Sequence, residues 1–262
     1  MSTMFHSSAR LREQLSQATS EERLQLTKLI DEARVTSYSA IELQKEACSS
    51  AGHSFGNIVR GEGISYLELL EDACENWGLT EVPSRYEKVK GNDYEHHDSS
   101  LYKFDLPDNQ RNAIVDERTE VLEEMMITKV AMGIFESLPT EQREEVARQI
   151  QEQASKMGDV SYQGMASSVA VMAAAKAGGF GTYMLMSSVL STVSMGTLGF
   201  GAYTLASSAL SLLLGPAGLL AMGAVGLVKL GSPSKKKVAS LGLAFAMISM
   251  RLRHQEHMTA SA

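Results

Sequence analysis

Two histidine clusters are the residues of this chain that come nearest to a metal-binding pattern. The first is His96, His97 and Asp98, in a polar stretch with two further acidic residues. Neighbouring histidines on regular structure rarely face one site, so this cluster does not predict bound metal. The second is His254 and His257, whose spacing can hold zinc on a helix, but no third ligand lies nearby. We therefore predict no metal and no other cofactor.

The two cysteines, Cys48 and Cys74, are the only thiols in the sequence. Both fall in segments with helical apolar spacing, where a packed thiol is more common than a nucleophile. Two separate cysteines form no disulfide framework, which favours a reducing compartment. The sequence also contains no Walker phosphate loop and no HExxH zinc motif. We predict a non-enzymatic, cytoplasmic protein.

A glycine motif separates two of the expected helices. It reads G-x-S-x-x-N-x-x-R-G-x-G-x-x-Y and consists of Gly52, Ser54, Asn57, Arg60, Gly61, Gly63 and Tyr66. A glycine-rich loop before a helix can bind phosphate on free backbone N–H groups. Here no strand precedes the loop, and Glu62 would repel an anion. We interpret Gly61 and Gly63 as a tight turn between helices, with a ligand site or a partner contact as alternatives.

This motif and the helix ISYLELLEDACENWGL after it resemble the YaaW-like bacterial family, which is grouped with the ubiquinol–cytochrome c chaperones. Acidic helices near residues 117–153 and a Gly/Ala-rich C-terminal segment ending in RLRH add to the resemblance. The resemblance implies an all-helical protein without established catalysis, and it transfers no catalytic residue. This chain departs from the family in its longer uncharged block.

Helical patterns also cover most of the remaining chain, so we predict an all-α fold. Thr19 and Glu22 match a capping box, and Gly78 lies where a helix should stop. SLPT interrupts the helical spacing between residues 110 and 156, with Thr140 as the expected cap of the next helix. Four regions follow: an N-terminal helical region (1–78), a polar linker (79–109), amphipathic helices (110–160), and an apolar hairpin with a basic C-terminal helix (161–262).

The chain runs from Ala177 to Val228 without a charged residue. A membrane-spanning helix needs about 20 apolar residues, so this block can hold two spans joined by a turn at Ser194–Gly201. Lysines at both ends fit a hairpin with cytoplasmic flanks. The predicted membrane-inserting residues are Phe180, Leu185, Leu190, Leu198, Phe200, Leu210, Leu213, Leu219, Leu220 and Val228. Small residues allow close helix packing, and the predicted packing positions are Gly215, Gly218, Gly223 and Gly226.

Two alternatives to insertion remain open at this point. A buried hairpin inside a soluble bundle would also lack charges. A mixed case is a hairpin that amphipathic helices wrap and then release into lipid, with residues 114–135 as the wrapper. The C-terminal stretch KKKVASLGLAFAMISMRLRH is too short to span a bilayer, and it suits an interfacial or a bundle helix.

The net charge of −7 argues against nucleic-acid binding, which needs a basic surface. We predict a helical protein at the inner membrane that acts as a membrane-inserting or pore-forming effector or stress factor. Its expected partners are membrane lipid, further copies of the chain and a protein partner. The alternative is a soluble or peripheral chaperone-like module that binds client proteins.

Overall fold

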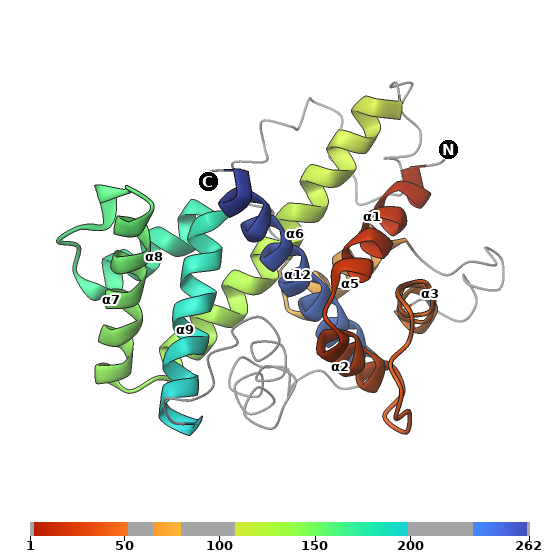
Figure 1. Ribbon diagram of the computed structural model, residues 1–262, viewed down its shortest axis with the longest axis horizontal. Coiled ribbons are helices and arrows are strands. Elements are labelled where there is room, and N and C mark those ends of the chain that lie inside the picture. Colours follow the sequence, from red (N-terminus) through yellow and green to blue (C-terminus); the bar gives the residue numbers. More distant parts are fainter. Residues whose placement is uncertain (1–2, 52–64, 80–107, 199–232, 261–262) are drawn as a thin grey trace.

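The computed structural model describes residues 3–51, 65–79, 108–198 and 233–260, and every regular element in these ranges is a helix (Figure 1). The predicted all-α class is confirmed for this part of the chain. The elements are α1 (Thr3–Gln17), α2 (Ser20–Ile30), α3 (Ala40–Ala51), α5 (Tyr66–Asn76), α6 (Asp108–Ser137), α7 (Thr140–Lys156), the 3-10 turn η3 (Val160–Tyr162), α8 (Ser167–Ala177), α9 (Phe180–Leu198) and α12 (Pro233–Ala260).

Local hydrogen bonds explain where several of these helices begin and end. The predicted capping box is present at α2, where Thr19 accepts from the backbone N–H of Glu22 and Glu22 accepts from that of Thr19. Ser65 and Glu68 form a second capping box at α5 that the sequence analysis did not identify. Gly78 ends α5 with a φ of 69°, as expected for a glycine after a helix.

Two predicted boundaries are wrong. Thr140 is the first residue of α7 rather than its cap, because Pro139 occupies the cap position and makes no side-chain hydrogen bond there. The turn expected to begin at Ser194 does not, because α9 continues to Leu198. The chain bends earlier, at Gly178 and Gly179, whose positive φ angles separate α8 from α9.

The long helix α6 joins two groups of helices (Figure 1). One group contains α7, α8 and α9, which contact one another, and α9 also packs on α6. The other contains α1, α2, α3 and α5 around α12, with α5 and α6 making the largest contacts to α12. The sequence segment proposed as a wrapper, residues 114–135, lies in α6 and contacts both α9 and α12.

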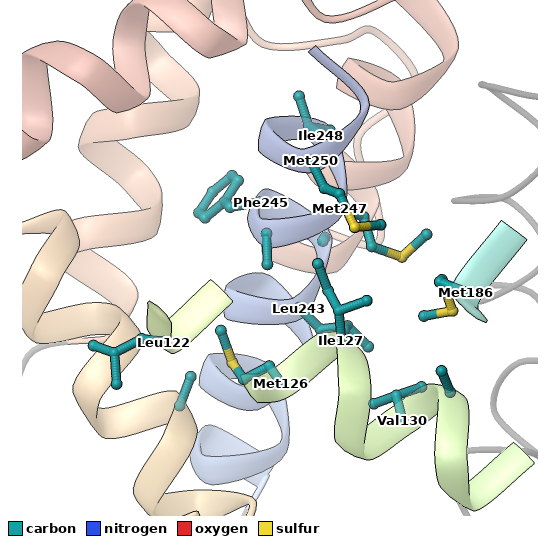
Figure 2. Close-up of a cluster of buried hydrophobic side chains, with 14 of the residues drawn as sticks. Leu122, Met126, Ile127, Val130, Met186, Leu243, Phe245, Met247, Ile248 and Met250 are labelled. Carbon is teal, nitrogen blue, oxygen red and sulfur yellow. The ribbon is translucent and has the colours of Figure 1, made fainter. Parts of the chain in front are cut away.

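The C-terminal helix α12 is the central element of the larger group. Every residue from Val238 to Met250 is buried, so this segment is a bundle helix in the structure and not an interfacial one. Its side chains meet those of α6 and α9 in one apolar cluster (Figure 2). On another side the ring of Phe245 contacts the ring of Tyr66 edge to face, with centroids 5.9 Å apart. Burial all round explains why α12 has an apolar middle without an exposed polar face.

Gly242 sets how closely α12 approaches α5. A Cβ atom built on Gly242 would lie 2.5 Å from the Cβ of Ala73, well inside van der Waals contact. A glycine at this crossing therefore allows a helix spacing that no other residue permits.

Among the described residues, no helix combines the length and the apolar character that crossing a membrane requires. This range includes α9, which holds the first part of the uncharged block. The predicted hairpin layout is therefore not confirmed, and most of its residues lie outside the described part of the chain.

We predict that Gly242→Ala destabilises the protein by about 1 kcal/mol. Alanine normally gains about 1 kcal/mol over glycine inside a helix, but forcing an extra methyl into this contact costs about 1–3 kcal/mol. The measurement is the free energy of unfolding in urea. The matched control is Ala73→Gly combined with Gly242→Ala, which moves the methyl across the contact and should restore wild-type stability. A stabilised single variant would contradict the close approach.

Candidate functional site

The most distinctive site in the described residues is a buried carboxylate, Glu123, in the middle of α6. Its side chain is fully shielded from solvent. Its oxygens accept hydrogen bonds from Tyr66 Oη at 2.8 Å, Ser249 Oγ at 2.7 Å and Arg253 Nη2 at 3.1 Å. The donors come from α5 and α12, so this one side chain connects three helices. A buried charge needs such partners, because an unpaired one would cost several kcal/mol.

Further charged residues extend this cluster towards the surface. Arg10 of α1 donates to Glu120 Oε1 at 2.8 Å and to Asp116 Oδ1 at 3.0 Å. Arg253 also lies 3.4 Å from Glu120, and His6 lies 3.0 Å from Asp116. The cluster therefore joins α1 and α12 to the same face of α6.

A second ion pair holds α12 against α2. Arg251 donates from Nε and Nη2 to the two oxygens of Glu22, at 2.9 Å and 2.8 Å. Only 2% of the Glu22 side chain is exposed. The same carboxylate accepts from the backbone N–H of Thr19 at 2.7 Å, so it caps α2 and binds α12 at once. Two parallel bonds from a guanidinium are among the strongest polar contacts in proteins.

A bridging hydrogen bond connects α1 to the same region. Gln14 donates from Nε2 to Ser249 Oγ at 2.8 Å, and Ser249 in turn donates to Glu123. At the opposite end of α12, Lys237 Nζ donates to the backbone oxygen of Ile30 at 2.7 Å. Polar contacts thus fix α12 near both of its ends, with the apolar stretch between them.

Burial is the largest influence on the pKa values of Glu123 and Tyr66. It raises the pKa of Glu123, and the nearby guanidiniums of Arg253 and Arg10 oppose that rise. The pKa of Tyr66 is also raised, by burial first and then by the charge of Glu123. Tyr66, Glu123 and Ser249 are all shielded from solvent, so a substrate cannot reach them in this conformation. The geometry suits holding helices together, not acid–base chemistry.

The structure locates one residue of the glycine motif, Tyr66, and gives it this structural role. The other motif residues, Gly52, Ser54, Asn57, Arg60, Gly61 and Gly63, lie outside the described residues, so their interpretation as a turn stays a prediction. Nothing in the sequence pattern indicated that Tyr66 would meet a carboxylate on a distant helix.

The cysteines lie where the sequence analysis expected them, in packed helix interiors. Cys48 and Cys74 are free and buried. Burial raises the pKa of each thiol to about 12. Since the thiolate is the reactive form, this shift disfavours reaction of either thiol in the folded protein.

Of the four histidines in the candidate metal patterns, the structure describes the side chain of His254 only. His254 stacks on the ring of Tyr183 with centroids 3.8 Å apart, which connects the end of α12 to α9. No group of three His, Cys, Asp or Glu residues within the described ranges could hold a metal ion. His96 and His97 lie outside those ranges.

The predicted membrane-inserting residues that the structure places are part of the protein core. Leu185 and Leu190 of α9 are buried, and Phe180 is partly buried against the same core. Two polar side chains of α9 also have protein partners: Thr182 pairs with Thr128 of α6, and Ser188 accepts from Gln153 of α7. Insertion of α9 would break these contacts, and it stays an untested prediction.

The remaining positions of that prediction lie beyond what the structure describes. For Leu198 only the helical backbone is placed. Outside the described residues are Phe200, Leu210, Leu213, Leu219, Leu220 and Val228, together with the packing glycines Gly215, Gly218, Gly223 and Gly226.

The sequence analysis overlooked one pattern associated with catalysis. Residues 52–56 read GHSFG, which matches the G-x-S-x-G sequence of a nucleophile elbow. That elbow works only as a sharp turn between a strand and a helix. The described residues contain no strand, and these five residues lie outside them. The pattern alone therefore assigns no catalytic serine.

Comparison with known protein families, with curated proteins and with solved structures gives no match. The resemblance to the YaaW-like family therefore stays a prediction, and function has to be argued from the residues themselves.

We predict that Tyr66→Phe lowers the free energy of unfolding by about 1.5–3 kcal/mol, because the variant loses a hydrogen bond to a buried charged group. Chemical denaturation followed by circular dichroism measures this change. Tyr162→Phe is the matched control, since Tyr162 is also buried and its hydroxyl donates to none of the described residues. Equal losses in the two variants would contradict the role of the bond to Glu123.

The raised pKa of Glu123 predicts a specific pH dependence. The folded protein binds this proton more tightly than the unfolded chain, so the associated stability is present at low pH and lost as pH rises through the raised pKa. Glu123→Gln cannot titrate. The unfolding free energy of the wild type minus that of Glu123→Gln should therefore fall as pH rises from about 4.3. A difference that grows with pH would mean that ion pairing outweighs burial.

Proposed function

We propose that this protein is a non-enzymatic helical protein that associates with the inner membrane through its uncharged segment, as a membrane-inserting or pore-forming effector or stress factor. The sequence observation that carries this proposal is the stretch from Gly199 to Val228, which contains no charged residue. It is longer than the roughly 20 residues that a helix needs to cross a bilayer.

The proposal concerns only the part of the uncharged block that follows α9. The first part of the uncharged block forms α9, where Leu185 and Leu190 are buried and Thr182 and Ser188 have hydrogen-bond partners in the bundle. We therefore assign lipid contact to residues after α9. The candidates are Phe200, Leu210, Leu213, Leu219, Leu220 and Val228, with Gly215, Gly218, Gly223 and Gly226 as positions for close packing between copies in an oligomer.

The helices that precede and follow this segment in the sequence are both packed in the bundle. Before it, α9 packs on α6, α7 and α8. After it, α12 is buried from Val238 to Met250 and bound by two ion pairs. The exposed Lys235 and Lys236 at the start of α12 provide positive charge next to the segment, which suits anionic headgroups.

The alternative function is a chaperone-like module that binds an apolar segment of a protein partner. One observation favours it: large apolar side chains are exposed around α8, with Val160 67%, Val169 52% and Met172 44% exposed. Exposed apolar groups of this kind occur at protein interfaces. Such a module would bind an unfolded client without requiring lipid, so binding to vesicles separates the two functions.

We predict that Leu213→Arg weakens binding of the full-length protein to lipid vesicles by roughly a hundredfold. An arginine in place of leucine at the centre of an inserted helix costs about 3 kcal/mol. Flotation with vesicles of phosphatidylethanolamine and phosphatidylglycerol, followed by an alkaline wash, measures the inserted fraction.

Val169→Arg is the matched control, since it adds the same charge at an exposed position of α8. It should leave insertion unchanged. A wild-type protein that remains entirely in the vesicle-free fraction as a monodisperse monomer would contradict the proposed function. Loss of client binding in Val169→Arg, with no vesicle binding by any variant, would favour the chaperone-like alternative.

A further inference from the structure

The two ion pairs of α12 have a consequence that depends on the proposed function. Residue 233 begins α12, only a few residues after the uncharged segment ends at Val228. If that segment moves into a bilayer, the nearest element it can displace on this side is α12. The contacts that hold α12 in the bundle therefore oppose any insertion that draws this helix out.

Both pairs join an arginine of α12 to a carboxylate that solvent does not reach. Arg251 binds Glu22 of α2, whose side chain is 2% exposed, and Arg253 binds Glu123 of α6, whose side chain is 0% exposed. Removing α12 would leave both carboxylates without their guanidiniums. Breaking one partner from a buried pair is strongly unfavourable, because the other charge stays in a poorly solvated site.

We propose that the pairs Glu22–Arg251 and Glu123–Arg253 form an autoinhibitory clasp that keeps α12 in the bundle and thereby limits entry of the adjacent uncharged segment into lipid. The clasp lies in the C-terminal half of α12, whereas the segment precedes its N-terminus. A packed α-helix is a rigid connection, so a contact at one end resists displacement at the other. The apolar cluster around Phe245 and Met247 also holds α12 in the bundle.

Glu22→Gln is the variant that isolates the clasp. Glutamine keeps the acceptor oxygen that the α2 capping box uses, so the local helix start is retained while the charge facing Arg251 is lost. Arg251→Lys is a milder variant, because lysine keeps the charge but not the two parallel hydrogen bonds. The double variant Glu22→Gln with Arg251→Gln removes both members of the pair.

The experiment measures dye release from vesicles of phosphatidylcholine and phosphatidylglycerol in equal amounts, with the full-length protein. Glu22→Gln should release dye about tenfold faster than the wild type or more, and Arg251→Lys should lie between them. The double variant should be no faster than the faster single variant, because residues that act as one pair are not additive. Circular dichroism and gel filtration confirm that each variant is folded before vesicles are added.

Two controls separate the clasp from general loss of stability. Glu152→Gln breaks the exposed pair with Arg148 on α7 and should not change release. Ile150→Ala creates a cavity beside α7, a helix that packs chiefly on α8 and α9. Dye release by Ile150→Ala and by Glu22→Gln is compared at equal stability. The urea concentration is chosen for each variant so that both have the same unfolding free energy.

Faster release by Glu22→Gln than by Ile150→Ala at equal stability supports the clasp. Equal release by these two variants overturns it, as does release by Glu22→Gln at the wild-type rate. If no protein, including the wild type, binds vesicles or releases dye, the proposed function fails and the clasp with it.

Discussion

The fold depends on the pairing of two buried carboxylates with two arginines of the last helix. Glu22 and Glu123 cannot be shielded from water unless α12 supplies Arg251 and Arg253. Their burial therefore requires that the C-terminal helix reach α2 and α6 across most of the sequence. Ser249, which lies two residues before Arg251, extends the same requirement to α1 through Gln14 and to α5 through Glu123 and Tyr66. One turn of α12 in this way connects four other helices.

This arrangement explains how a chain with a long uncharged block forms an ordered bundle. The block is not uniform, because its first part forms α9, where serine and threonine side chains bind partners on α6 and α7. The uncharged stretch beyond α9 precedes a helix that is fixed near both ends, by Lys237 at one and by the arginines at the other. The proposed membrane association and the helical core thus involve neighbouring segments of the chain.

Features set by local sequence were predictable, and those set by distant contacts were not. The capping box of Thr19 and Glu22, the glycine stop at Gly78 and the all-α class follow from patterns within a few residues. The burial of Glu22 does not, because a capping glutamate is usually exposed and nothing nearby in sequence indicates Arg251. Likewise α12 has the same composition as an interfacial helix, and only the surrounding helices make it a central one. Thr140 was misassigned because Pro139 occupies the cap position of α7, where it makes no side-chain hydrogen bond.

Native-state hydrogen exchange along α12 tests the central claim most directly. If the buried pairs fix this helix in the bundle, amides from Val238 to Met250 should exchange only through global unfolding, with the same free energy as the core amides of α5 and α6. Exchange of these α12 amides through a local opening of much lower free energy, while α5 and α6 stay protected, would contradict the account.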